Sequence, residues 1–205
     1  MKFTTVLTAL LLIWGVAGAT VINVPGDQAT IQAGINTAVD GDTVLVADGT
    51  YTGTGFKNLN FSGKGIVVMS ANGPENCIID CQYSGRGVAF QSGEDSTSVF
   101  KGFTIRNGAQ GPIFILNANN PVVENCIIHR SEGVGIYCMN SDPTLIRCVM
   151  DSCISYSGSG GGMSFSMGSD PDIINCVFYN CSAGKGGCIH FANSTGLIKI
   201  GRAHV

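Results

Sequence analysis

The chain has 205 residues with a formal net charge of −3, and it contains 29 glycines but only 12% charged residues. Because 44% of the residues are hydrophobic and the glycines follow no three-residue period, this composition excludes charged disordered chains and collagen; the scarcity of charge excludes coiled coils. The basic side chains are few and scattered, so we expect no nucleic-acid partner. These numbers favour a secreted β protein that is rich in turns.

The first 19 residues have the pattern of a signal peptide. Lys2 precedes an apolar run from Val6 to Val16, and the small residues Ala17-Gly18-Ala19 follow it as a cleavage pattern. We therefore expect cleavage near Ala19 and a secreted, periplasmic or cell-surface protein. The run is too short to span a bilayer, and no later segment reaches about 18 uninterrupted apolar residues, so we expect no membrane span in the mature chain.

A short helix is predicted near residues 28–39. Its apolar residues recur with helical spacing, and Asp40-Gly41 provides a plausible stop. The residues expected on one face of this helix are Ile31, Ile35, Ala38 and Val39.

Beyond this segment, a short apolar phrase repeats along the chain. Counted between its anchor residues, the spacings are 26, 23, 22 and 28 residues. A period in the twenties indicates a solenoid, and the sparse leucines argue against a leucine-rich repeat. The anchor residues are Cys77, Phe103, Cys126, Cys148 and Cys176.

Each of the later phrases predicts two short strands joined by a corner. Asn125, Arg147 and Asn175 fall at this corner, and Asn tolerates a left-handed backbone at little cost. Prolines stand at equal offsets before the phrase, where a strand can begin without a backbone N–H. They are Pro121, Pro143 and Pro171.

Short strands, glycine-rich corners, the Asn corner and a period near 23 residues together resemble the right-handed parallel β-helix of the pectate lyase-like superfamily, in its secreted bacterial type. The opening motifs Thr30-Ile31-Gln32, Gly41-Asp42-Thr43 and Gly49-Thr50-Tyr51 strengthen the resemblance. It implies an all-β, single-stranded parallel β-helix of six or seven coils over residues 20–198, with the helix near 28–39 plugging the first coil.

The end of the chain departs from this repeat. Residues 200–205 resemble the in-frame translation of a sequencing adapter that overlaps the codon of Lys199. We therefore expect residues 199–205 to be a non-native tail on a gene truncated at its C-terminal end.

One position of the repeat carries the most suggestive chemistry. It follows the last inward residue of each phrase, and stacking places its members roughly 4.8 Å apart on one exposed face. Asp80, Arg106, His129, Asp151 and Tyr179 form this exposed row, which is the candidate binding face. Arg106, His129 and Asp151 are its candidate catalytic residues. The alternative interpretation is a ladder of ion pairs between coils, each contributing roughly 0.2–1 kcal/mol.

The cysteines suggest two inward rows. Cys126, Cys148 and Cys176 form one, and Cys153 and Cys181 form another five residues later. Cysteine packs as a small hydrophobe, which favours a core ladder. Disulfides between adjacent coils are also geometrically feasible in an exported protein. Zinc is disfavoured, because the cysteine spacings lack a usual fourth ligand.

Two aspartates are weak calcium candidates. Asp142 and Asp170 each precede a proline at matching repeat positions, although an Asp there is more typically a turn residue. No other cofactor is expected. The glycine-rich segment 158–162 is expected to form a corner or a small lip.

The favoured function is that of a secreted or cell-surface, non-catalytic β-helix module that contacts polysaccharide or cell-surface glycan. The alternative is a lyase, hydrolase or epimerase of pectin-like polymers, or the binding part of such an enzyme. The Gly-His-Gly and paired-Asp hallmarks of pectin hydrolases do not occur in the sequence. In addition, Asp80 and Asp151 lie about 14 Å apart along the row, too far for a glycosidase pair at roughly 5–10 Å.

Overall fold

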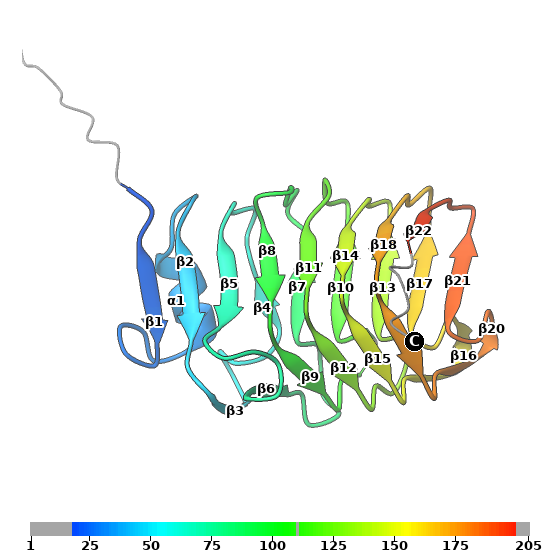
Figure 1. The fold of residues 1–205 in the computed structure, drawn as a ribbon, viewed down its shortest axis with the longest axis horizontal. Coiled ribbons are helices and arrows are strands. Elements are labelled where there is room, and N and C mark those ends of the chain that lie inside the picture. The colour runs from blue at the N-terminus through cyan, green and yellow to red at the C-terminus, as the bar shows by residue number, and fades with distance from the viewer. Residues whose placement is uncertain (1–17, 110, 200–205) are drawn as a thin grey trace, which may run out of the picture.

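The computed structural model describes residues 18–109 and 111–199. Short parallel strands wind into a β-helix in which three sheets enclose one core (Figure 1). The first sheet has eight strands, so the chain makes seven turns between its first and last strand. This number agrees with the six or seven coils expected from the repeat. The predicted all-β parallel solenoid is therefore confirmed.

Each of the six coils from β2 to β21 contributes one strand to each sheet. The first sheet contains β1 (Val21–Val24), β2 (Thr43–Val46), β5 (Val67–Ser70), β8 (Val99–Lys101), β11 (Val122–Glu124), β14 (Thr144–Ile146), β18 (Asp172–Ile174) and β22 (Leu197–Lys199). The second contains β3 (Gly49–Thr52), β6 (Cys77–Asp80), β9 (Thr104–Arg106), β12 (Ile127–His129), β15 (Val149–Asp151) and β19 (Val177–Tyr179). The third contains β4 (Leu59–Asn60), β7 (Val88–Phe90), β10 (Ile113–Leu116), β13 (Ile136–Met139), β17 (Met163–Ser166) and β21 (Ile189–Ala192).

Two further strands, β16 (Ile154–Ser159) and β20 (Ser182–Lys185), pair outside the three sheets. They lie between the second and third sheets at the C-terminal end of the described chain (Figure 1). The glycine-rich segment 158–162 begins within β16 and leads into β17, so the expected lip is present. We refer to β16 and β20 together as the lip.

The helix α1 (Ile31–Thr37) is shorter than the predicted segment 28–39. It begins at the N-cap Thr30, whose hydroxyl accepts a hydrogen bond from the Ala33 N–H at 3.1 Å. Its end is fixed by Lys64, whose ammonium donates to the carbonyls of Ile35, Asn36 and Ala38 at 2.7–2.8 Å.

The prediction that Val39 belongs to the helical face is wrong. The backbone turns to ψ 147° at Ala38, so Val39 leaves the helix and its side chain is 57% exposed. Ile31, Ile35 and Ala38 are buried as expected, and α1 packs on β1, β2 and β4. A Cβ at Gly34 would lie 2.8 Å from a methyl group of Val44, so this glycine permits the close approach of helix and sheet.

Left-handed residues turn the chain at the corners between sheets. Asn125, Arg147 and Asn175 have φ between 50° and 54°, as the sequence predicts. Pro121, Pro143 and Pro171 immediately precede β11, β14 and β18, so the predicted strand starts are confirmed as well. Equivalent left-handed residues follow the strands of the second and third sheets: Asn107, Arg130, Ser152 and Asn180 at one corner, and Asn117, Asn140, Met167 and Asn193 at the other.

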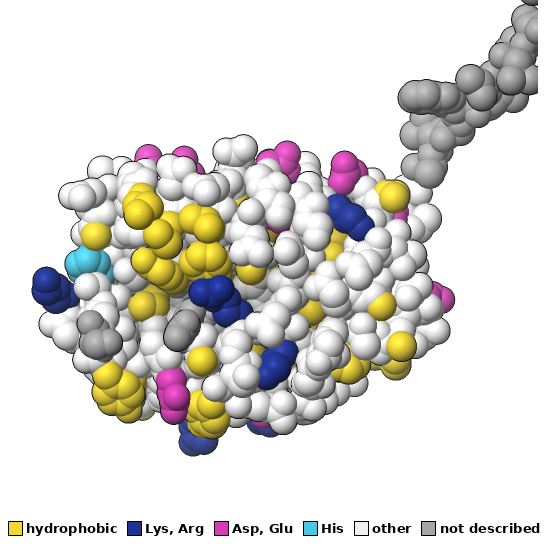
Figure 2. Space-filling model, turned by 180° about the vertical axis from the view of Figure 1, so that it is seen from behind, with side chains coloured by type: hydrophobic (Ala, Val, Ile, Leu, Met, Phe, Trp, Pro, Cys, Tyr) yellow, Lys and Arg dark blue, Asp and Glu magenta, His cyan; other side chains and the backbone are white. Residues whose placement is uncertain are grey.

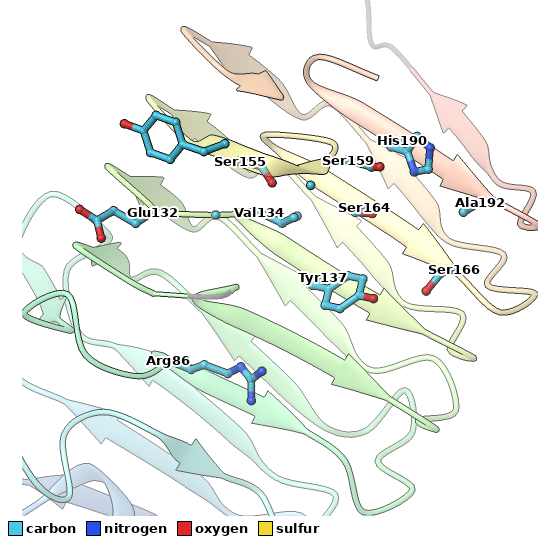
Figure 3. A pocket seen from close by; sticks show the side chains of 13 residues that line it. Arg86, Glu132, Val134, Tyr137, Ser155, Ser159, Ser164, Ser166, His190 and Ala192 are labelled. Atoms are coloured by element: carbon cyan, nitrogen blue, oxygen red, sulfur yellow. The ribbon is translucent and has the colours of Figure 1, made fainter. Parts of the chain in front are cut away.

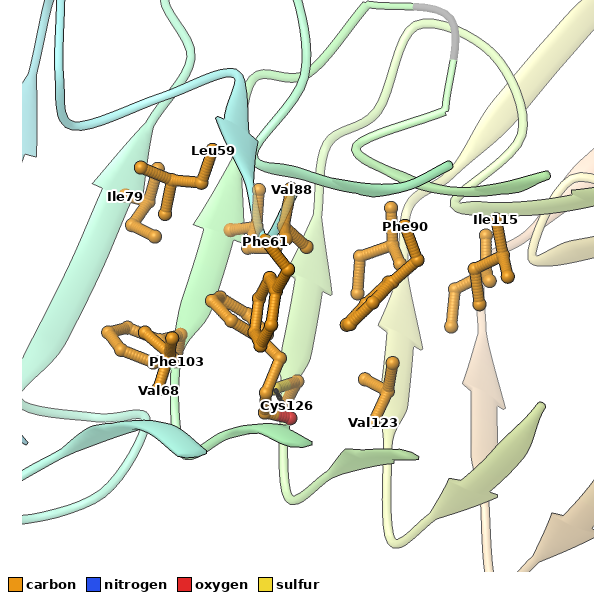
Figure 4. Packing of buried hydrophobic residues seen from close by; sticks show 14 of the residues in the cluster. Leu59, Phe61, Val68, Ile79, Val88, Phe90, Phe103, Ile115, Val123 and Cys126 are labelled. Atoms are coloured by element: carbon orange, nitrogen blue, oxygen red, sulfur yellow. Dashed lines mark hydrogen bonds between the residues drawn. The ribbon is translucent and has the colours of Figure 1, made fainter. Parts of the chain in front are cut away.

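The core is a set of stacked apolar rows (Figure 4). Phe100 and Phe103 stack with ring centroids 4.5 Å apart, and the rings of Phe61 and Phe90 from successive coils lie 4.7 Å apart. Cys126 and Cys148 are fully buried and Cys176 is half-buried, so the predicted inward cysteine ladder is confirmed. All nine cysteines lie in the described chain as free thiols.

Two predictions concern segments outside the described residues. Most of the predicted signal peptide, residues 1–17, and all but Lys199 of the predicted tail 199–205 fall there. Lys199 itself ends β22, which pairs with β18. Within the described chain, α1 is much too short to cross a membrane.

Candidate functional site

The exposed row lies on the outer face of the second sheet, as predicted. The strand register places Asp80 beside Arg106, Arg106 beside His129, and His129 beside Asp151, while Tyr179 follows on β19. The sequence therefore placed all five residues correctly in one row.

Within this row the charged groups are engaged with one another. Arg106 Nε lies 2.9 Å from Asp80 Oδ2, and His129 Nδ1 lies 2.8 Å from Asp151 Oδ2. Burial raises the pKa of Asp80, but hydrogen bonds from the Asn107 amide and the Gln82 N–H, together with Arg106, outweigh it and lower the pKa overall. Tyr179 ends the row with a side chain that is 62% exposed.

This geometry favours the ladder interpretation of the row over a substrate site. A ligand at Arg106 would have to compete with Asp80, and one at His129 would have to compete with Asp151. The catalytic roles considered for Arg106, His129 and Asp151 stay predictions.

The calcium candidates are also engaged between coils. Asp142 Oδ1 accepts the Asp170 N–H at 2.8 Å, and Asp170 Oδ1 accepts the hydroxyl of Thr195 at 2.9 Å. Each carboxylate thus fastens its turn to the next coil. In the described part of the chain, no group of three or more His, Cys, Asp or Glu side chains is placed to hold a metal ion. Calcium binding at Asp142 and Asp170 remains an untested prediction.

A groove of about 690 Å³ lies on the outer face of the third sheet (Figure 3). Its floor is formed by β13, β17 and β21, and β16 of the lip forms one wall. Ligand sites typically have volumes of about 300–1,000 Å³, so the groove can hold a small molecule or part of a polymer. A smaller hollow of about 270 Å³ lies at the corner between the first and second sheets, beside Glu124 and Arg147.

Aromatic rings lie at one end of the groove. Tyr137 lines it and neighbours Phe114 on the adjacent strand, with ring centroids 6.0 Å apart. Phe114 faces outward but is only 8% exposed, in part because the guanidinium of Arg86 lies 4.1 Å above its ring. Burial lowers the pKa of the Arg86 guanidinium from its ordinary value. Apolar side chains gather on this side of the molecule, with Lys and Arg beside them (Figure 2).

Polar side chains line the remainder of the groove. Tyr137, Ser164 and His190 occupy one outward-facing row across β13, β17 and β21, and they stand on the same side of the sheet in Figure 3. Nδ1 of His190 is buried and has no hydrogen-bond partner within the described residues. Glu132 and further hydroxyl groups complete the lining; these belong to Ser155, Ser159, Ser166 and Tyr156.

The sequence interpretation missed this groove. It followed the outward row of the second sheet, although the third sheet has an equivalent row in which Phe114, Tyr137, Ser164 and His190 are separated by 23, 27 and 26 residues. An aromatic pair in an outward row was the available signal. The walls could not be foreseen, because the lip depends on how an irregular glycine-rich segment folds back.

The groove can bind a ligand that offers a flat apolar face and several hydroxyl groups. The Tyr137 ring provides a stacking surface, while serine hydroxyls provide hydrogen bonds. The charged groups Arg86 and Glu132 lie in the same lining, so the groove can also orient a polar or charged substituent.

Of the comparisons with known proteins, the match to a family model agrees with this architecture. A solved structure described as "Pectin methylesterase from Carrot" aligns with 89% of this chain and 84% of its own, at 13% identity and a TM-score of 0.45. No curated protein matches the sequence. The family model described as "Right handed beta helix region" matches residues 42–201. The chain therefore belongs to the family of proteins with a right-handed β-helix region.

Proposed function

We propose that the chain is a non-catalytic, secreted or cell-surface β-helix module that binds polysaccharide or cell-surface glycan in the groove on the third sheet. The observation that supports this function best is the presence of an aromatic surface and several hydroxyl groups in one open groove. Sugar rings have an apolar face and a rim of hydroxyls, which match such a lining.

The shape of the groove supports an elongated ligand. Among the lining residues, Tyr137, Ser164 and His190 lie on three successive strands, which span two strand spacings or about 10 Å. A chain-like ligand would thus contact several coils at once. This proposal moves the binding face from the exposed row, whose charges are paired, to the groove.

The lining supports binding more than glycoside hydrolysis. Glycosidases place two carboxyl groups around the scissile bond, and among the residues that line the groove only Glu132 has one. One observation favours the catalytic alternative, because Ser164 and His190 are paired on adjacent strands as a nucleophile and base could be. However, His190 Nδ1 has no partner among the described residues, so that nitrogen does not activate Ser164.

Affinity electrophoresis tests this proposal. The chain would be run through gels that contain polygalacturonate, xylan or mixed β-glucan, alongside Tyr137→Ala and Tyr137→Phe. We expect retardation by at least one polymer, a loss of at least about tenfold in affinity for Tyr137→Ala, and near-normal binding for Tyr137→Phe, which keeps the ring.

Arg106→Ala serves as the matched control on the second sheet and is expected to bind normally. Equal retardation of the parent chain, both Tyr137 variants and Arg106→Ala would contradict binding in the groove. Turnover of any of these polymers that disappears in Ser164→Ala would contradict the non-catalytic assignment.

A further inference from the structure

Two cysteines stand where the chain enters the two strands of the lip. Cys153 immediately precedes β16, and Cys181 immediately precedes β20. Ile154 pairs with Ser182, and the Ser182 N–H donates to the Cys153 carbonyl at 3.0 Å. Cys153 and Cys181 therefore occupy equivalent positions on successive coils.

The two side chains are stacked neighbours in the register of adjacent coils, and their thiols interact electrostatically. Stacked residues of a parallel sheet have Cα atoms about 4.8 Å apart, which lies within the roughly 4.4–6.8 Å range of disulfides. A disulfide also requires the two Cβ atoms to lie about 3.8 Å apart.

The two thiols differ in exposure and in acidity. Cys153 is fully buried, whereas Cys181 is half-buried beside the exposed residues Asn180 and Ser182. The interaction with Cys153 lowers the pKa of Cys181 to about 7, despite the opposing effect of burial. The same interaction, together with burial, raises the pKa of Cys153. A thiol of this kind is an accessible nucleophile, and its neighbour is a protected one.

We propose that Cys181 is a thiol–disulfide exchange site whose reaction is completed by Cys153, which closes a disulfide between the last two described coils. The oxidant is a small-molecule disulfide. The Cys181 thiolate attacks one of its sulfurs, forms a mixed disulfide and expels one thiolate. Cys153 then loses its proton, attacks Cys181 Sγ and expels the second thiolate, so two protein thiols and one disulfide become one protein disulfide and two small thiols.

Other cysteines nearby are less suited to this role. Cys188 lies in the same coil as Cys181, and its sulfur is placed 3.8 Å from the Cys181 carbonyl oxygen. Burial, and then contact with Cys181, raises the pKa of Cys188. Cys148 contacts Cys176 in a similar way, but it also stacks on Cys126, so its thiol has neighbours in both adjacent coils.

The disulfide would fasten one wall of the groove. It joins residues 28 positions apart in the sequence, and the coil that Cys181 begins carries β20 and β21, including His190. Closing a loop of this length restricts the unfolded chain, so oxidation should raise the melting temperature by about 5 °C or more. This inference does not depend on the identity of the groove's ligand.

Disulfide mapping tests the inference. The reduced chain is exposed to oxidised glutathione, its remaining thiols are alkylated, and its peptides are identified by mass spectrometry. We expect a Cys153–Cys181 link in the unmodified sequence and a stable glutathione adduct on Cys181 in Cys153→Ser. Cys181→Ser should form neither product, and its melting temperature should not rise on oxidation.

Cys138→Ala is the matched control. Cys138 is fully buried in the third sheet between Ile115 and Phe165, and the variant should form the Cys153–Cys181 link like the parent. An unmodified Cys181, a Cys181–Cys188 link, or a link confined to Cys148 and Cys176 would each overturn the inference. Mapping on the parent chain decides the question even if a variant does not fold.

Discussion

The outer faces of the second and third sheets carry similar residue types, but these side chains make different contacts. On the second sheet, Arg106 is paired with Asp80 and His129 with Asp151. On the third sheet, Arg86 lies over an aromatic ring and His190 has a buried nitrogen without a partner among the described residues. A row of polar residues is thus not sufficient to indicate a site, because stacking can satisfy its members internally.

The two faces differ because their surrounding segments differ. Only Asn125 and Cys126 separate β11 from β12, so the chain passes directly from the first sheet to the second. Between the second and third sheets, the connection from β15 to β17 is longer and includes β16 of the lip. This longer connection places β16 beside the third sheet, where its residues form a wall of the groove.

The largest effect is expected in the core that both faces share. Cys148→Lys should prevent folding, because it buries an unpaired charge at a position that is fully buried. Cys148→Ala should lower the free energy of unfolding by only about 1–2 kcal/mol, through a small void. Circular dichroism and thermal melts would measure both. If the Lys variant folds with ordinary stability, Cys148 faces outward and the inward register is incorrect.

A smaller effect is expected on the paired face. Asp80→Asn removes the ion pair with Arg106 and weakens the acceptor for Asn107, so we expect the free energy of unfolding to fall by about 1 kcal/mol. Denaturant titration would measure the loss, and glycan binding should not change. If the substitution weakened binding tenfold, the two faces would not be functionally distinct.

The stability of the Asp80–Arg106 ion pair depends on pH. Because the pKa of Asp80 is lower in the folded chain, its stabilising contribution is present above its ordinary value of 3.8 and is lost as the pH falls through the lowered value. The difference in melting temperature between the parent chain and Asp80→Asn should therefore be largest at pH 6 and should shrink below pH 3. A difference that stays constant over this range would contradict the assignment.

The smallest effect is expected at Arg106. Arg106→Ala removes a half-exposed partner and should change the free energy of unfolding by less than about 1 kcal/mol. We also expect the parent chain to release no unsaturated, ultraviolet-absorbing product from uronate polymers with calcium present. Turnover that disappears in Arg106→Ala would instead make the second sheet a lyase-like site.

The periodicity of the sequence predicted the fold in detail, because each inward position recurs as an apolar residue from coil to coil. The corner residues Asn125 and Arg147, the cysteine ladder and the register of Asp80 with Arg106 all follow from the repeat. The end of α1 was less predictable, because Lys64 caps it from a distant part of the sequence. The groove was missed for a similar reason, since its wall comes from a segment that breaks the repeat.

A map of the bound ligand on the protein surface would test the central claim most directly. A labelled sample would be titrated with an oligosaccharide of whichever polymer retards the chain, and amide chemical shifts would be followed by NMR. We expect the largest changes at Tyr137, Ser164 and His190, with the signals of Arg106 and His129 unchanged. Changes centred on Arg106 and His129, with Tyr137 unaffected, would contradict the assignment of the third sheet as the binding face.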